Sequence, residues 1–193
     1  MASDETIPGA GVESSAPQWR PGDSRADVPS MLRVDQAGEY GATRIYAGQL
    51  AVLGNRHPAS RLIARMAAQE RRHLEIFDGM MVDRGIRPTL LQPVWNVAGH
   101  ALGVVTALMS PQAAMACTAA VETEIDRHYG DQLRILADEE PDLAATITEF
   151  QAEEVEHRDT ALAAGAESAA GYLILSAVIR AGCRAAIALS KRI

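Results

Sequence analysis

Proline and glycine divide the chain after residue 28 into six segments of helical length. The breaks between these segments fall at residues 54–58, 85–88, 110–111, 139–141 and 165–168. Apolar side chains recur every three or four residues, and no segment alternates apolar and polar residues long enough to predict a strand. Ser30 predicts the cap of a helix that begins near Met31, and Ser110 precedes a proline that suits a first helical turn. The pattern therefore predicts an all-α fold of six helices.

Two of the six segments are much more apolar than the others. Residues 89–120 contain no Asp, Glu, Lys or Arg, and the stretch 89–109 is long enough to cross a bilayer. Four residues interrupt that stretch: Gln92, Pro93, Asn96 and His100. Residues 171–193 are also apolar and carry four basic side chains: Arg180, Arg184, Lys191 and Arg192. Both segments fit helices that lie against a membrane, and both equally fit buried helices of a soluble bundle.

The N-terminal region differs from the helical segments. Residues 1–28 contain several Pro, Gly and Ser residues and no apolar run, which predicts a flexible tail and no signal peptide. Three acidic residues precede the first arginine, Arg20, so the region does not resemble a transit peptide. We expect residues 29–193 to form one domain, because 193 residues rarely make two.

Composition and charge narrow the possible functions. The chain has 35 alanines and only 4% aromatic residues, which favours helices over a β-sandwich. Its net charge is -7, and it has no basic stretch of the kind that binds nucleic acid, so we expect no nucleic-acid partner. Cys117 and Cys183 lie far apart without a second metal-ligand motif nearby, which indicates neither a disulfide framework nor a zinc finger.

Candidate chemistry lies in two Glu-x-x-His motifs, Glu70 with His73 and Glu154 with His157. On a helix each pair shares one face, and in both motifs that face is otherwise apolar. Two further glutamates, Glu39 and Glu122, lie on similar apolar faces of two other predicted helices. The interval along the chain from Glu39 to Glu122 differs by a single position from the interval between the two motifs. The spacing predicts a duplicated pair of helices.

Four carboxylates that point into one apolar core need cations to neutralise them. Carboxylate oxygens together with two imidazoles suit a pair of iron or manganese ions. One glutamate from each of two helices, with Glu-x-x-His from each of two others, is the ferritin-like di-metal pattern. The alternative is a core in which these side chains pair with nearby arginines such as Arg44, Arg71 and Arg127.

The side chains around the motifs offer weaker candidates. Four glutamates point away from the predicted ligand face and are expected to be solvated: Glu75, Glu124, Glu153 and Glu156. Three histidines are expected to be structural: His57, His100 and His128. Tyr129, two turns after Glu122, fits either a residue that supports the ligands or a plain core tyrosine. Asp35, one turn before Glu39, fits either the partner of a ligating histidine or a helix N-terminal charge.

Beyond these motifs, several stretches of the chain after the tail form a recognisable set: 32–42, 44–49, 87–89, 95–97, 114–122, 153–157 and 181–184. In these stretches the chain resembles the demethoxyubiquinone hydroxylase family of ubiquinone biosynthesis. It implies a di-iron monooxygenase on a ferritin-like four-helix bundle, with O₂ as co-substrate. It also implies six ligands to two iron ions per chain. Glu39 and His73 would bind one ion, Glu122 and His157 the other, and Glu70 and Glu154 would bridge them.

The resemblance implies a polyprenylated benzoquinol that lacks one methoxy group as the substrate. Such a quinol lives in the bilayer, so the two apolar helices are expected to face the membrane surface as a peripheral attachment. The expected location is the cytoplasmic side of the cell membrane, or the matrix side of the inner membrane in a mitochondrion. Trp95, Gly99 and Gly103 would border the substrate route, although the two glycines equally fit close helix packing.

The sequence also bears on the reductant, the assembly and the competing functions. No Gly-x-Gly-x-x-Gly fingerprint is visible, so the reductant is expected to be external, either NADH or the quinol itself. A homo-oligomer and a complex with other proteins of ubiquinone biosynthesis are both compatible with the chain. The ligand pattern alone also fits a manganese catalase, a rubrerythrin-like peroxidase, an iron-storage protein or a membrane scaffold with a structural metal.

Overall fold

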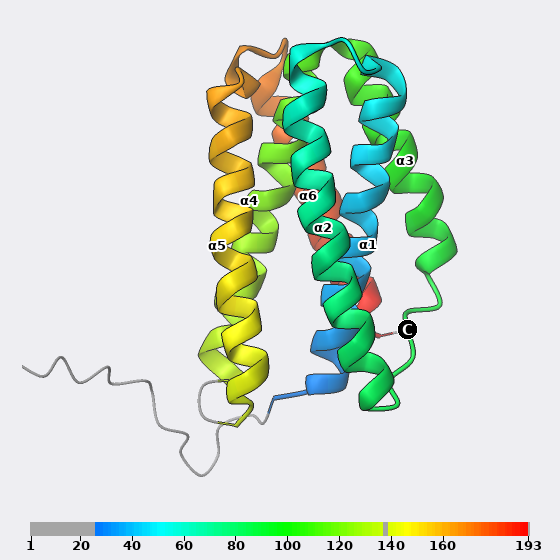
Figure 1. Ribbon diagram of the computed structural model, residues 1–193, viewed down its shortest axis with the longest axis vertical. Helices are drawn as coiled ribbons and strands as arrows, with labels where there is room; N and C mark the ends of the chain where they lie inside the picture. Colours follow the sequence, from blue (N-terminus) through cyan, green and yellow to red (C-terminus); the bar gives the residue numbers. More distant parts are fainter. Residues whose placement is uncertain (1–25, 137–138, 193) are drawn as a thin grey trace, which may run out of the picture.

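The computed structural model describes residues 26–136 and 139–192, which form a bundle of helices aligned roughly along one axis (Figure 1). Within these residues the α-helices are α1 (Val28–Leu53), α2 (Pro58–Asp83), α3 (Gln92–Met109), α4 (Pro111–Leu136), α5 (Pro141–Ala163) and α6 (Tyr172–Ser190). A short 3₁₀ helix, η1 (Ala166–Ser168), precedes α6, and the described residues contain no strand. The prediction of an all-α fold is confirmed.

The helix starts show where the local prediction succeeded and where it failed. Ser110 caps α4 as expected, because its hydroxyl accepts a hydrogen bond of 3.0 Å from the backbone N–H of Ala113. Helix α1, however, begins at Val28, and its cap is Asp27, whose carboxylate accepts a 3.2 Å bond from the backbone N–H of Ser30. The predicted cap at Ser30 is therefore wrong, since Asp27 caps equally well and Pro29 fits the first turn. Of the predicted tail, residues 1–25 lie outside the described part.

Helices α1, α2, α4 and α5 surround the centre of the bundle. Two clusters of buried apolar side chains fill its two ends, one around Tyr46, Met66 and Met115 and the other around Phe77 and Phe150. Along each of the four helices the predicted ligand positions fall between residues of the first cluster and residues of the second. A layer of buried polar side chains therefore separates two apolar layers.

Helices α3 and α6 lie outside this arrangement and expose apolar side chains. Val97 and Leu108 of α3 are 69% and 68% exposed, and Leu173 and Ile174 of α6 are 80% and 75% exposed. Helix α6 is long and apolar enough to cross a membrane, yet only 11% of it is buried. The buried residues are Gly103, Thr106 and Ala107 in α3 and Ile179 and Ser190 in α6, so within the described chain neither helix is a fully buried member of the bundle.

Helix α3 packs very closely against α1 through glycines. A Cβ atom added to Gly103 would lie 2.0 Å from the carbonyl oxygen of Ile45, and one added to Gly48 would lie 2.3 Å from the carbonyl oxygen of His100. No side chain fits at such distances, so Gly103 serves helix packing. Gly99 is less crowded, with the Gly41 carbonyl oxygen 3.0 Å from the corresponding position.

Candidate metal centre

Six buried side chains from four helices meet in the polar layer of the bundle. They are Glu39 of α1, Glu70 and His73 of α2, Glu122 of α4, and Glu154 and His157 of α5, each at most 1% exposed. Their ligand atoms form two groups, and within each group all ligand atoms lie within 4.8 Å of one another. The first group is Glu39, Glu70, His73 and Glu154, and the second is Glu70, Glu122, Glu154 and His157. Glu70 and Glu154 belong to both groups, as bridging ligands would.

Both imidazoles direct the same nitrogen into the centre. His73 Nδ1 lies 3.1 Å from Glu154 Oε1 and 3.3 Å from Glu39 Oε2. His157 Nδ1 lies 3.0 Å from Glu70 Oε1 and 3.1 Å from Glu154 Oε2. Each histidine therefore contacts a bridging glutamate of the other helix pair, so the site forms only when the two pairs pack together.

Burial shapes the electrostatics of the centre. It raises the pKa of Glu70 well above its usual range, and the charges of Glu154 and Glu39 raise it further. Burial also raises the pKa of Glu122 well above its usual range, with Glu154 adding to the effect. For His73 burial alone would lower the pKa, but the nearby carboxylates of Glu154 and Glu39 outweigh it and raise the pKa to about 10. In the metal-free protein, protons therefore take the place of cations.

Several ligand atoms of the centre lack hydrogen-bond partners within the protein and are suited to bind metal ions. Four buried atoms make no well-aligned hydrogen bond: Glu70 Oε1, His73 Nδ1, Glu122 Oε2 and Glu154 Oε1. A metal ion would satisfy these atoms, and a set of carboxylate and imidazole donors suits iron or manganese. The arginine alternative fails, because no arginine among the described residues forms an ion pair with the four glutamates.

Two tyrosines form hydrogen bonds to Glu39 and Glu122, the outer glutamates, each of which belongs to only one ligand group. The hydroxyl of Tyr129 donates a short hydrogen bond to Glu39, and that of Tyr46 donates a bond of 2.8 Å to Glu122. The interval along the chain from Tyr46 to Tyr129 equals the interval from Glu39 to Glu122. Tyr129 was a sequence candidate, whereas the supporting role of Tyr46 was missed. Applying the duplication offset to Tyr129 would have identified it.

The outward nitrogens of the histidines have partners of their own. His73 Nε2 lies 2.8 Å from Glu153 Oε2, and His157 Nε2 lies 3.1 Å from Gln69 Oε1. The expectation that Glu153 is solvated is wrong, since its side chain is only 23% exposed and also binds Arg72. Hydrogen bonds at the outward nitrogen fix the orientation of a metal-ligating histidine.

Comparisons with known proteins place the chain in a family. Residues 26–190 match the model of the family described as ubiquinone biosynthesis protein COQ7. The chain belongs to the COQ7 family. A 3-demethoxyubiquinol 3-hydroxylase of Rhodospirillum rubrum is 50% identical over 100% of this chain and 92% of its own length. A mitochondrial NADPH-dependent 3-demethoxyubiquinone 3-hydroxylase of Mus musculus is 51% identical over 88% of this chain and 79% of its own length.

In this COQ7-family chain the remaining sequence candidates lie outside the centre. Asp35 is 2% exposed and bonds to His128 at 3.2 Å and to Gln132 at 2.7 Å, so it orients neither His73 nor His157. His57 caps α2 by accepting a bond from the backbone N–H of Ala59. His100 lies on α3, and Glu75 and Glu156 are exposed, as expected.

Glu124 is a clear departure from the sequence prediction. It was expected to be solvated, but it is 2% exposed and pairs with Arg180 at 2.6 Å and with Arg184 at 2.8 Å. Both arginines belong to α6, which covers this side of α4. The prediction is wrong because helical phase shows only that Glu124 points away from Glu122, and not that another helix lies there.

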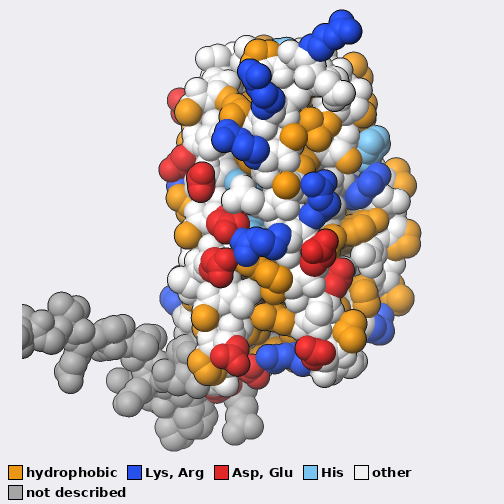
Figure 2. All heavy atoms as spheres, in the orientation of Figure 1, with side chains coloured by type: hydrophobic (Ala, Val, Ile, Leu, Met, Phe, Trp, Pro, Cys, Tyr) orange, Lys and Arg blue, Asp and Glu red, His pale blue; other side chains and the backbone are white. Residues whose placement is uncertain are grey.

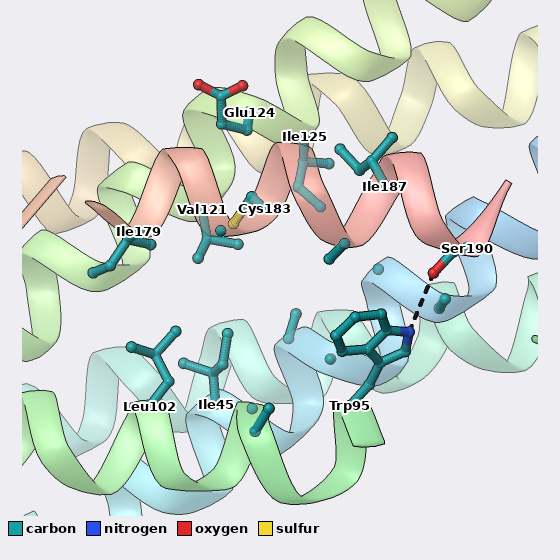
Figure 3. A pocket seen from close by; sticks show the side chains of 18 of the residues that line it. Ile45, Trp95, Leu102, Val121, Glu124, Ile125, Ile179, Cys183, Ile187 and Ser190 are labelled. Atoms are coloured by element: carbon teal, nitrogen blue, oxygen red, sulfur yellow. Dashed lines mark hydrogen bonds between the residues drawn. The ribbon is translucent and has the colours of Figure 1, made fainter. Parts of the chain in front are cut away.

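A largely apolar cavity of about 400 Å³ lies between α1, α3, α4 and α6 in this family member (Figure 3). Trp95 projects from α3 toward α6, and its indole N–H donates a bond of 3.1 Å to Ser190. The lining includes Trp95 and Gly99 but not Gly103. It also includes Gly38 and Val121, the sequence neighbours of Glu39 and Glu122. The cavity and the metal centre thus lie on two sides of the same helices, α1 and α4.

Proposed function

We propose that this chain is a di-iron monooxygenase that hydroxylates the ring of a polyprenylated demethoxyubiquinol. The observation that carries the proposal is the pair of overlapping ligand groups in a COQ7-family chain. Relatives at about half identity are named as 3-demethoxyubiquinol 3-hydroxylases or demethoxyubiquinone hydroxylases. Helices α1, α2, α4 and α5 supply the ligands in the manner of a ferritin-like bundle.

Each ligand has a distinct role in the proposal. Glu39 and His73 would hold one iron and Glu122 and His157 the other, and Glu70 and Glu154, which belong to both ligand groups, would serve both positions. When bound, the two ions supply the redox chemistry that uses O₂ to hydroxylate the ring. Tyr46 and Tyr129 keep Glu122 and Glu39 oriented by hydrogen bonds. The apolar layers at both ends of the bundle keep bulk water away from the centre.

The apolar cavity is the proposed place for the quinol. Its apolar lining suits a prenylated ring, and it adjoins the helices that carry Glu39 and Glu122. Trp95 and Gly99 border the proposed route, while Gly103 holds α3 against α1. The volume of about 400 Å³ suits a ring with part of its tail, so the remaining tail would extend toward the outer face of α3 and α6.

The outer faces of α3 and α6 are the proposed membrane contact. Figure 2 shows charged side chains spread over the face formed by α2 and α5, whereas hydrophobic side chains gather along the flank where α3 lies. Amphipathic helices with such exposed apolar faces lie in the membrane interface. Peripheral attachment on the cytoplasmic side of a cell membrane, or on the matrix side in a mitochondrion, would deliver a bilayer quinol to the cavity.

The reductant is proposed to be external to the chain. Mammalian relatives are named NADPH-dependent, which favours a nicotinamide nucleotide over the quinol as the electron source. The stoichiometry requires two electrons and two protons for each O₂, with one oxygen atom entering the ring and the other leaving as water. Omitting the nucleotide from an assay that contains oxidised demethoxyubiquinone should therefore abolish product.

The decisive experiment combines metal analysis with an isotope-labelled assay. The full chain, loaded with iron under anaerobic conditions, should bind two ions, and with NADPH as reductant it should transfer one atom of ¹⁸O₂ to the ring of a short-chain demethoxyubiquinol. Turnover of hydrogen peroxide without ring hydroxylation would instead favour a catalase or peroxidase. Full hydroxylation by a metal-free preparation would refute the proposal.

A further inference from the structure

The two histidines of the centre are held from behind by chemically different partners. A carboxylate accepts the hydrogen bond from His73 Nε2, at 2.8 Å from Glu153 Oε2. An amide oxygen accepts the bond from His157 Nε2, at 3.1 Å from Gln69 Oε1. The two partners occupy equivalent positions, because Gln69 directly precedes Glu70 and Glu153 directly precedes Glu154. The two halves of the duplicated sequence thus place these partners at the same position, but one partner is a charged carboxylate and the other a neutral amide.

The surroundings keep the charge of Glu153 in place. Arg72 of α2 donates to Glu153 and also to Glu149, the latter at 2.9 Å. The side-chain amide of Gln69 donates a further bond of 3.3 Å to Glu153 Oε2. Gln69 therefore uses its oxygen for His157 and its nitrogen for Glu153, which fixes the orientation of its amide. His73 therefore donates to a carboxylate and His157 to an amide oxygen, and flipping the Gln69 amide would break both of its hydrogen bonds.

The two metal positions have the same types of ligand, so they differ only in the partners behind the histidines. Each position has one histidine, one outer glutamate held by a tyrosine hydroxyl, and the two shared glutamates. A carboxylate behind an imidazole makes a stronger hydrogen bond than an amide does and raises the basicity of the nitrogen that binds the metal. His73 is therefore the stronger of the two imidazole ligands.

We propose that the two metal positions are inequivalent, and that the position of Glu39 and His73 binds a divalent ion more tightly and fills first. Glu153 is the positioning residue that creates the difference, acting through His73, and Gln69 is its weaker counterpart behind His157. This inference rests on the proposed function, in that the six residues bind two ions.

Anaerobic titration of the metal-free full chain with Co²⁺, followed by the visible absorption of the bound ion, tests the proposal. Two binding steps alone are not decisive, because repulsion between two dications also separates them. The decisive result is which position binds the first Co²⁺ ion. His157→Ala should leave the tighter Co²⁺-binding step intact, whereas His73→Ala should abolish it.

Substitutions behind the histidines give the second test. Glu153→Gln should weaken the tighter step by about 10–100-fold, the usual effect of losing an outer-shell partner, and bring the two steps together. Glu149→Gln is the matched control, because Glu149 also pairs with Arg72 but touches neither histidine. It should leave both steps unchanged.

The outcomes separate this inference from the proposed function. Equal effects of His73→Ala and His157→Ala on the tighter step, or equal effects of Glu153→Gln and Glu149→Gln, would overturn the inequivalence while two ions still bind. Failure of the unaltered chain to bind Co²⁺ or Fe²⁺ at all would instead overturn the di-metal site. Melting of each metal-free variant verifies that it is folded.

Discussion

Helices α2 and α5 lie on one side of α1 and α4, and helices α3 and α6 lie on the other. The faces of α2 and α5 toward α1 and α4, called the inner region, bury two glutamates and two histidines, whereas α3 and α6, called the outer region, expose valine, leucine and isoleucine. Helices α1 and α4 lie between them, with Glu39 and Glu122 on one side and the apolar cavity on the other. The difference places the buried carboxylate and imidazole groups on one side of α1 and α4 and an apolar cavity on the other.

The largest expected effect comes from removing a ligand of the inner region. His73→Ala or Glu122→Ala should lower iron content and hydroxylation together, and the loss of activity should exceed about 100-fold, beyond that typical of outer-shell changes. Glu75→Gln, on the exposed face of α2, is the control and should retain both. Iron analysis alongside turnover checks the prediction, and equal damage from Glu75→Gln would contradict the assignment of the ligand face.

The next effect tests how α3 is held against α1. Gly103→Leu should destabilise the protein by about 1–3 kcal/mol, because its Cβ would collide with the Ile45 carbonyl oxygen. Thermal melting should show a loss of roughly 2–4 °C for each kcal/mol. Gly79→Ala has open space around it and should be neutral or stabilising. Unchanged melting of Gly103→Leu would show that α3 is free to move away from α1.

A smaller effect is expected from substitutions that test the proposed membrane contact of the outer region. Val97→Asp in α3 or Ile174→Asp in α6 should weaken binding to liposomes by roughly 10-fold each, since burying one such apolar side chain contributes about 1.5–3 kcal/mol. Val82→Asp is the matched control, because Val82 is 78% exposed but lies on α2. Flotation that is unchanged in both outer variants would refute the membrane contact.

The smallest effect is a pH dependence confined to the metal-free centre. The raised pKa of His73, about 10 in the folded protein against 6.5 unfolded, stabilises the fold fully below pH 6.5. That stabilisation should be lost as the pH rises from 6.5 through 10. We expect the metal-free protein to melt a few degrees lower at pH 9.5 than at pH 6.5.

Two comparisons isolate the contribution of His73 from that of other titrating groups. Metal-free His73→Gln should show a flatter dependence of melting temperature on pH over this window. Iron-loaded protein should also be flatter, because the ion replaces the proton. A slope that is the same in all three samples would show that the charge of His73 is not responsible.

Much of the fold and of the candidate centre could be predicted from the sequence because the relevant signals are local. Proline, glycine and apolar periodicity placed the six helices, and the Glu-x-x-His spacing placed each pair on one helical face. The nearly constant interval between the two halves of the chain then joined Glu39, Glu70, Glu122 and Glu154 into one hypothesis. The structure brings the side chains of that hypothesis together.

What the sequence by itself determined is the phase of each helix, that is, which side chains share a face. Only the tertiary structure decided what lies opposite each face. Glu124 and Glu153 looked solvated by phase, yet Arg180 and Arg184 meet the first, and His73 and Arg72 meet the second, from 56 to 81 residues away. Helical phase follows from backbone geometry within a few residues, whereas these partners depend on how separate helices pack, which no local pattern encodes.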